Sequence, residues 1–363
     1  MDRRYEFLDG LRGVAAIVVM LMHFLSPLGW EAGIVPHAHL AVDFFFCLSG
    51  FVLTHAYGGM LASGRPMLRR FYLGRAIRLY PMLVLGLAIG TASLLTKLIL
   101  GGSERQEVMN LLYAMLTNLL LLPSPFLLGA QADAWPINVP QWSLLFESIA
   151  LLALPWLLRL GDRLLMVVVV ATGAAIVAHG VAGPGVMDGG IGALLAAGMI
   201  RVAYPFSLGI LLHRLRARRP RRQSASGARC AGLAGLLVVV LSLPVPQPFI
   251  WFYEVGAVLV LLPGLLLLAA SVAPTVRLRP LAIWLGAISY PLYMLHYPVV
   301  RMVMGSLRRL DAPAWQYGLA IGVAMAGCLW LAWIALRRID EPVRRWLTRR
   351  CAGEAATLAK VNA

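Results

Sequence analysis

Long apolar segments recur along almost the whole of this 363-residue chain. A helix needs about 20 predominantly apolar residues to cross a bilayer, and about eleven segments come near that length. Hydrophobic residues make up 60% of the sequence and charged residues 13%, against about 25% charged in soluble domains. We therefore predict an all-α, polytopic membrane helical bundle. The segments lie near residues 13–30, 39–57, 80–100, 108–127, 143–159, 164–182, 190–212, 230–246, 249–272, 281–303 and 315–336.

The positive charges occupy short stretches between the apolar segments. The net charge is +16, and arginines cluster at 3–12, 65–78, 214–229 and 337–350. Such a distribution is typical of cytoplasmic loops and of contact with anionic headgroups, so we expect membrane lipids and not nucleic acid as the partner of these charges. Both termini are predicted to be cytoplasmic in a multi-pass protein.

Counting the segments exposes a conflict between residues 80 and 160. Two cytoplasmic termini require an even number of crossings, whereas eleven is odd. The arginines at 65–78 and at Arg159 and Arg163 all look cytoplasmic, yet three segments separate them. One of the three should be re-entrant or interfacial, which membrane proteins allow where the backbone is buried in protein. We expect about ten crossings and place the irregular region near the proline-rich stretch 124–141.

The first segment carries an ionisable residue at each end. Arg12 lies at its inner boundary, and His23 follows eleven residues later, about 16 Å along a helix. Charged and titratable side chains are costly inside a bilayer and mark function by default. The predicted topology places further ionisable residues toward the outer side with His23, and an arginine pair toward the cytoplasm. The outer group is Asp43, Glu147 and His296, and the inner pair is Arg75 and Arg78.

Five sequence blocks together resemble a known family. They read LDGLRGVAAIVVMLMHF, VDFFFCLSGFVLTHAY, FYLGRAIRLYPM, WSLLFE and SYPLYMLHYPV, and they span residues 6 to 300 in the family's order. The chain resembles the acyltransferase-3 family of bacterial integral-membrane O-acyltransferases. The resemblance implies a bacterial inner-membrane enzyme that transfers an acyl group, usually acetyl, to surface glycans and related acceptors. Acetyl-CoA would be a co-substrate, with no cofactor bound permanently.

The same resemblance assigns roles to residues. Arg12 and His23 match the family's arginine–histidine pair, Arg75 and Arg78 its arginines spaced three apart, and Glu147 its glutamate after tryptophan, serine and leucine. His296 stands where the family often has a late histidine. We assign His296 and Trp142 to the binding of the acceptor, a carbohydrate or lipid-linked glycan.

The chemistry of these side chains supports the assignment. We expect His23 to act as general base on the acceptor hydroxyl, or to carry the acyl group briefly itself. Asp43 or Glu147 would then orient the other imidazole nitrogen. Arg75 and Arg78 share a helix face, and arginine forks suit the phosphates of coenzyme A. Arg12 would meet the pantetheine end, pair with a carboxylate or reach a lipid phosphate.

Plainer interpretations stand beside these. His23 could merely hydrogen-bond a backbone carbonyl, and Arg75 and Arg78 could be membrane anchors. A metal site built from His23, Asp43, Glu147 and His296 is not expected, because no paired histidine motif supports it. The alternative function is a transporter or flippase, to which broken helices and midplane charges would also fit. Consumption of acyl-CoA discriminates between the two.

The remaining expectations concern organisation. Residues 1–336 form the transmembrane domain and residues 337–363 a basic cytoplasmic tail, with no fused soluble domain, and nothing in the sequence indicates an oligomeric state. Ser49-Gly50 is interpreted as a site of close helix packing, not as a nucleophile. Less specific residues are expected in structural roles: Glu254 in an aromatic belt, His37 and His39 in an outer loop, and Asp340 and Glu341 in salt bridges of the tail.

Overall fold

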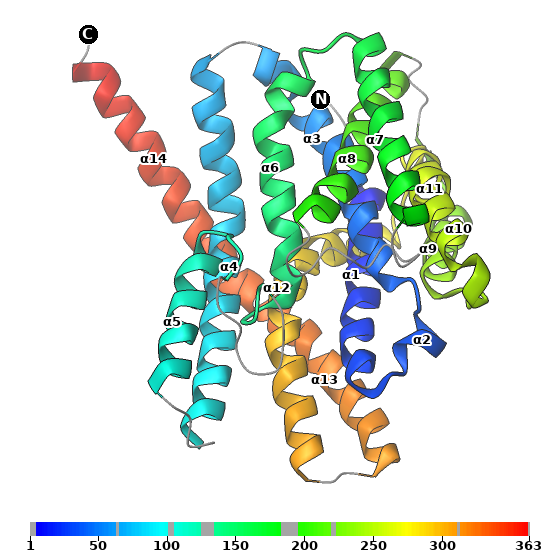
Figure 1. Ribbon diagram of the computed structural model, residues 1–363. Coiled ribbons are helices and arrows are strands. Elements are labelled where there is room, and N and C mark those ends of the chain that lie inside the picture. Colours follow the sequence, from blue (N-terminus) through cyan, green and yellow to red (C-terminus); the bar gives the residue numbers. More distant parts are fainter. Residues whose placement is uncertain are drawn as a thin grey trace.

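The computed structural model describes residues 5–62, 65–100, 105–124, 134–182, 195–218, 223–310 and 313–361, and these are almost entirely helical (Figure 1). The predicted all-α class is therefore confirmed. The helices are α1 (Glu6–Leu25), α2 (Glu31–Ile34), α3 (Ala41–Ala62), α4 (Arg65–Leu100), α5 (Arg105–Leu119), α6 (Trp142–Leu157), α7 (Asp162–Ala182), α8 (Leu195–Arg218), α9 (Gly227–Ser242), α10 (Ile250–Gly256), α11 (Leu262–Ala269), α12 (Arg279–Arg309), α13 (Ala314–Ala335) and α14 (Glu341–Val361).

Seven helical stretches of the described residues are long and apolar enough to cross a membrane. Five begin in α1, α4, α7, α8 and α13, and two begin in the 3-10 turns Ala38–Leu40 and Gln247–Phe249, which lead into α3 and α10. The α10 and α11 helices join through a π-helical segment, Ala257–Leu261, and count as one stretch. Short parallel strands β1 (Ser224–Ala225) and β2 (Val272–Ala273) tie the start of α9 to the segment before α12. The chain is thus a multi-pass membrane bundle.

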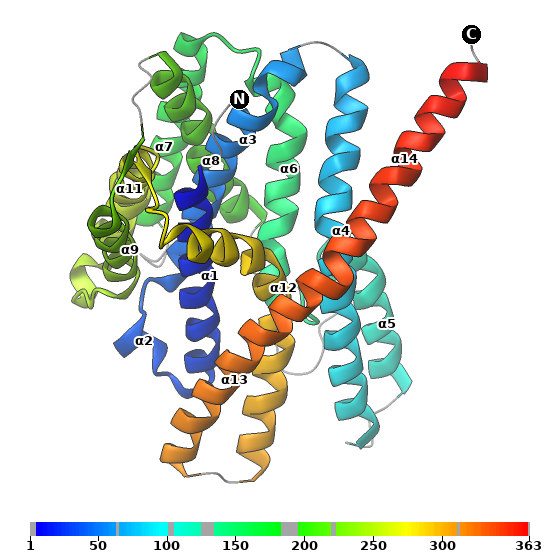
Figure 2. The same cartoon turned by 180° about the vertical axis from the view of Figure 1, so that it is seen from behind.

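The region of the parity conflict contains two short helices, and the predicted number of about ten crossings stays a prediction. The arginine cluster at 65–78 and the apolar segment at 80–100 form one 36-residue helix, α4. The α5 and α6 helices have only 15 and 16 residues, about 22 and 24 Å, against a hydrocarbon core of about 30 Å. In Figures 1 and 2, α5 lies beside one half of α4, and α6 lies toward the other half. Neither crosses alone, and residues 125–133 of the predicted irregular stretch lie outside the described residues.

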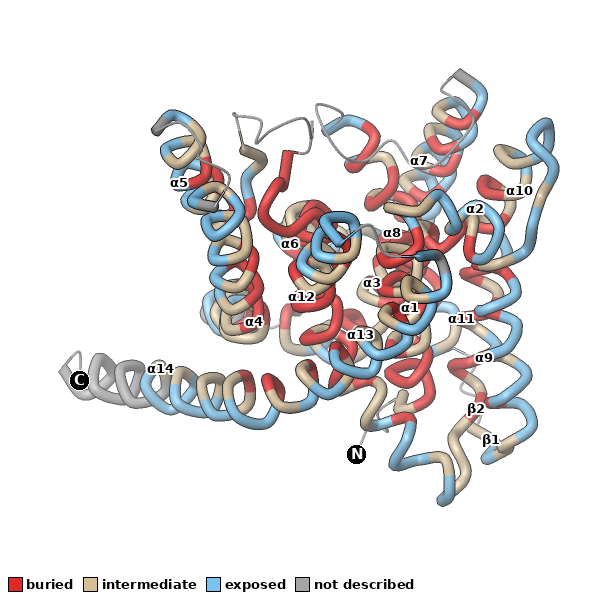
Figure 3. Tube along the Cα trace, turned by 90° about the horizontal axis from the view of Figure 1, so that it is seen from below, coloured by how far each residue is buried: buried red, intermediate tan, exposed pale blue. Residues whose placement is uncertain are grey.

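Glycines allow two helix pairs in the core to approach closely. A Cβ on Gly13 would lie 2.5 Å from the Leu285 carbonyl oxygen, so α1 and α12 pack backbone to backbone. A Cβ on Gly50 would lie 2.1 Å from the Phe206 carbonyl oxygen, where α3 meets α8. Small residues have this role in membrane helices, which confirms the packing interpretation of Gly50. Buried segments gather where these four helices meet, as Figure 3 shows.

The predicted basic tail is a helix continuous with the bundle. A π-helical segment, Leu336–Asp340, joins α13 to α14, and α14 packs against α4 (Figure 2). In Figure 1 the start of α1 and the end of α14 point toward the same end of the bundle. The tail therefore begins inside the packed structure, at the level of the arginines on α4.

Candidate functional site

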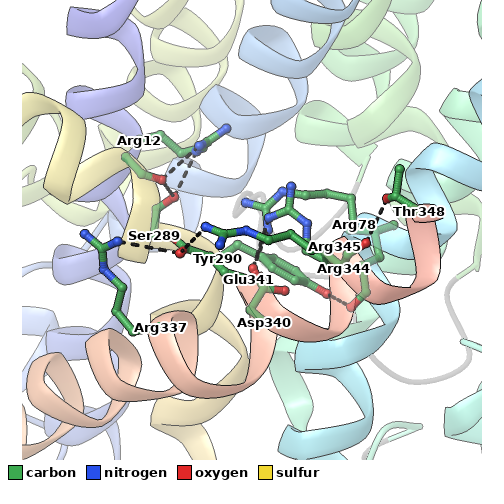
Figure 4. Close-up of polar contacts among 12 residues, drawn as sticks. Arg12, Arg78, Ser289, Tyr290, Arg337, Asp340, Glu341, Arg344, Arg345 and Thr348 are labelled. Carbon is green, nitrogen blue, oxygen red and sulfur yellow. Dashed lines mark hydrogen bonds and ion pairs between the residues drawn. The ribbon is translucent and has the colours of Figure 1, made fainter.

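Arg12 makes two hydrogen bonds to α12 and one ion pair within α1. Its Nε donates to Ser289 Oγ at 2.9 Å, and its Nη2 donates to the Gly286 carbonyl at 3.0 Å (Figure 4). Asp9, one turn earlier on α1, lies 3.4 Å from Nη2. The close approach of the two helices at Gly13 brings these groups within reach. The LDGLRG motif thus combines a glycine contact with an arginine that bridges α1 and α12.

A cavity with a mixed lining of arginines and apolar side chains opens beside Arg12. Its empty volume is about 880 Å³, part of it open to solvent. Helices α1, α3, α4, α6 and α12 line it, and aromatic side chains such as Phe45 and Tyr290 form much of its apolar wall. The predicted residues that line the cavity are Arg12, Arg75, Arg78 and Glu147.

Glu147 belongs to the arginine end of the bundle. Its Oε1 accepts a hydrogen bond from Ser49 Oγ at 2.9 Å and lies 3.9 Å from Arg75 Nη2. The prediction that Glu147 lies on the outer side with His23 is therefore wrong. The physical reason is that α6 spans only half the bundle, so its first turns begin beside α4. Arg75 Nε is buried and has no hydrogen-bond partner among the described residues.

Arg78 is held from two sides. Its Nη1 donates to Asp340 Oδ2 at 3.4 Å, and its guanidinium carbon lies 5.1 Å from the centre of the Tyr290 ring. Asp340 is fully buried and also accepts from Arg344 at 3.1 Å, as Figure 4 shows. The salt-bridge interpretation of Asp340 is confirmed, but the sequence analysis missed that its partner is a cavity arginine. The only available signal was an acidic residue after two arginines in RRIDEP.

His23 pairs with His296. His23 Nδ1 lies 2.9 Å from the Val19 carbonyl and 3.2 Å from His296 Nε2, and His296 Nδ1 lies 2.9 Å from the Leu292 carbonyl. Carbonyl oxygens only accept, so these partners assign the proton of each ring to Nδ1. His23 Nδ1–H is then shared between Val19 and His296, which leaves the lone pair of His23 Nε2 available. His296 is fully buried, whereas His23 is partly exposed.

Among the residues that the structure describes, no carboxylate contacts His23. Asp43 instead accepts from Arg201, at 2.6 Å from Nη2 and 3.3 Å from Nε, and both residues are 1% exposed. The predicted contact of Asp43 or Glu147 with His23 is therefore replaced by His296. A full positive charge from α8 attracts a buried carboxylate more strongly than a neutral imidazole does. Arg201, which the sequence analysis missed, also faces Trp142, whose ring centre lies 5.2 Å from its guanidinium carbon.

A second histidine cluster does contain a carboxylate. His37 Nδ1 and His39 Nε2 lie 2.9 and 3.2 Å from Glu254 Oε1, and His37 and Glu254 are buried. The expected loop histidines and aromatic-belt glutamate thus form one buried group, because α10 packs where the chain enters α3. Within the described part of the chain, no group of three or more His, Cys, Asp or Glu side chains could hold a metal ion.

Comparisons with known proteins agree over most of the chain. The sequence model of a family described as the acyltransferase domain matches residues 5–334. Protein 2 in the picA locus of Rhizobium radiobacter is 37% identical over 153 residues, which cover 40% of this chain and 78% of that protein. Peptidoglycan O-acetyltransferase OatA of Listeria monocytogenes is 24% identical over an alignment of 373 positions. This alignment covers 95% of this chain but 56% of OatA. No solved structure matches.

Proposed function

This chain belongs to the acyltransferase-3 family, and we propose on that premise that it is a membrane O-acetyltransferase. It moves an acyl group, acetyl in the first instance, from acyl-coenzyme A to a hydroxyl of a saccharide or lipid-linked glycan. The observation that carries the proposal is the arrangement along α1, where an arginine-lined cavity lies at Arg12 and a histidine pair at His23.

The cavity supplies a site for the donor. Three guanidinium groups line one opening, and the buried Nε of Arg75 has no hydrogen-bond partner among the described residues. A buried donor without a partner is costly, so a ligand oxygen at this position would stabilise the site. Phosphates suit arginine forks, and the aromatic wall suits the apolar pantetheine arm. We assign phosphate binding to Arg75 and Arg78, and contact with the pantetheine arm to Arg12. From there the arm would extend along α1 toward His23, which lies about 16 Å away and outside the lining of this cavity.

The histidine pair supplies the proton chemistry. His23 Nε2 takes the proton of the acceptor hydroxyl as its oxygen attacks the thioester carbon. The carbon–sulfur bond then breaks, and the leaving thiolate recovers the proton from His23. A positioned general base contributes about 10²–10⁴ in rate. His296 fixes the tautomer through its Nε2, whose own orientation is set by the Leu292 carbonyl.

A transient acyl-histidine is the variant of this mechanism. His23 Nε2 would attack the thioester itself, the thiolate would leave, and the acceptor hydroxyl would then displace the acyl group from the ring. Both routes need the same unprotonated Nε2. They differ in whether label from the donor stays on the protein when the acceptor is withheld.

The test is acyl transfer in membranes that contain the full chain. Radiolabelled acetyl-CoA is supplied with the host's glycans and lipids, and wild type is compared with His23→Ala and with His179→Ala, a histidine on α7 outside the site. We expect label in an extractable glycan or lipid for wild type and His179→Ala, and a loss of at least about a hundredfold for His23→Ala. If no membrane consumed acetyl-CoA, acetyl transfer would be overturned in favour of transport or another acyl donor.

A further inference from the structure

A second cavity lies between α3, α6 and α8, near the carboxyl ends of all three helices. Its empty volume is about 1160 Å³, part of it open to solvent. It shares no lining residue with the first cavity: α8 lines only the second, whereas α1, α4 and α12 line only the first. We propose that this second cavity binds the phosphate headgroup of an anionic phospholipid.

The cavity carries an excess of positive charge. Arg159, Arg214 and Arg218 line it together with one carboxylate, Asp162. Arg214 is structural, because its guanidinium donates to carbonyl oxygens at the end of α6, including that of Leu158 at 2.8 Å. It also lies 3.0 Å from Asp162 Oδ1. One carboxylate against three guanidinium groups leaves the site cationic.

Arg159 and Arg218 are the groups placed to meet a ligand. Arg159 is exposed, and its guanidinium forms no ion pair with any residue that the structure describes. Arg218 pairs with Asp162, yet its side chain is 66% exposed. Arg159 can thus turn toward a phosphate without breaking a buried contact, whereas Arg218 would meet the phosphate while it keeps its contact with the buried Asp162 Oδ2.

Two histidines also line this cavity. His213 Nε2 lies 3.3 Å from His55 Nδ1, and the two rings pack against Phe51 and Tyr5 respectively. A pair of neutral imidazoles carries no charge, so the preference of the lining for an anion comes from its three arginines. Apolar residues such as Leu61 complete the lining.

The surroundings favour a lipid over a soluble phosphate. On α6, Leu152 and Trp156 are 54% and 60% exposed, and on α7 the exposed residues include Leu164 and Val167. In a membrane bundle such outward apolar surface faces acyl chains. The cavity opens where α6 passes into α7, so a headgroup could occupy it while the chains cover this surface. Basic pockets between membrane helices bind phospholipid headgroups in this way.

The test measures thermal unfolding of the full chain in vesicles of phosphatidylcholine with increasing phosphatidylglycerol. The variants are Arg159→Gln, Arg218→Gln and their combination, and the matched control is Arg349→Gln, an exposed arginine on α14. We expect phosphatidylglycerol to raise the Tm of wild type and control. In each single variant, about fivefold more phosphatidylglycerol should be needed to reach half of the maximal increase in Tm, since each arginine contributes about 1 kcal/mol.

The contrary results are equally specific. An unchanged response of both single variants would overturn the proposal, even if the double variant failed to fold. Inorganic phosphate or coenzyme A, added in phosphatidylcholine vesicles, could instead raise the Tm of wild type but not of the Arg159→Gln variant. That result would assign the cavity to a soluble phosphate and overturn the lipid. The Tm does not depend on catalysis, so the lipid proposal can fail while acetyl transfer is confirmed, and the reverse.

Discussion

The two ends of α1 differ in how they handle charge. At the Arg12 end, each cavity arginine has a carboxylate within 4 Å, and the pairs are Arg12–Asp9, Arg75–Glu147 and Arg78–Asp340. At the His23 end the partners are a second imidazole and backbone carbonyls, all neutral. One end therefore holds permanent charge and the other an available lone pair.

Under the proposed function, this difference separates donor binding from proton transfer. Arginines that bind a phosphate must stay charged. The nearby carboxylates hold the guanidinium groups in place, and each guanidinium keeps further N–H donors for the phosphate. A general base must stay unprotonated until the hydroxyl comes, and a carboxylate beside it would favour the protonated form. About 16 Å of helix lie between the two residues, so a substitution at one end should leave the other intact.

The largest effect is expected for His23→Ala. The rate at saturating donor should fall about 10³-fold, because the general base is gone, while the donor Kd stays within about twofold. Single-turnover transfer and equilibrium binding of labelled acetyl-CoA measure the two quantities separately. If the donor Kd of His23→Ala rose by as large a factor as its rate falls, the two ends of α1 would form one site.

The reciprocal change is Arg75→Gln. A lost hydrogen bond to a charged group is worth about 1.5–3 kcal/mol, so the donor KM should rise roughly 10- to 150-fold with little change in kcat. Arg69→Gln, an exposed arginine on the same helix outside the cavity, is the control and should behave as wild type. Equal effects of the two substitutions would mean that Arg75 is only a membrane anchor.

The sequence could predict the helices and which residues are unusual, but not their partners. Apolar length and arginine clusters sufficed for the bundle, which is confirmed, and the motif blocks singled out Arg12, His23, Arg75 and Arg78, whose roles stay predictions. Glu147 was misplaced because its depth depends on α6 spanning half the bundle, which hydropathy cannot show for a 16-residue segment. A partner such as His296, 273 residues away from His23, depends on how α12 packs against α1.

The carboxylates illustrate the same limit. Pairing a histidine with a nearby acid is sound chemistry, and the molecule does so at His37 and Glu254. Neither His37 nor Glu254 was a candidate for catalysis. Asp43 was a candidate, but its charge is neutralised by the buried Arg201. Residue type and approximate depth therefore identify a set of groups, and only the packing decides which pairs form.

A smaller effect is expected at His296. His296→Phe keeps an aromatic ring, although a larger one, and removes the acceptor for His23 Nδ1–H. The tautomer is then less well fixed, and kcat should fall about tenfold. His296→Gln, whose side-chain oxygen can accept, should recover part of the rate, and the donor KM should not change. A loss in both variants with a raised donor KM would argue for a structural role instead of positioning.

The smallest effect tests whether the tail helix belongs to the arginine end. The family match stops at residue 334, yet Asp340 beyond it is fully buried and binds Arg78. Asp340→Asn keeps the shape but removes the charge. We expect the donor KM to rise about threefold and the free energy of unfolding to fall by about 1–2 kcal/mol.

Glu341→Gln provides the matched control. Glu341 pairs at 3.3 Å with Arg345, whose side chain is 71% exposed, and exposed pairs contribute about 0–1 kcal/mol. Its donor KM and its unfolding in detergent should be close to those of wild type. If both variants matched wild type, the start of α14 would only rest on α4. A change confined to Asp340→Asn would extend the donor site beyond the matched domain, because a carboxylate from the tail would then set the position of Arg78.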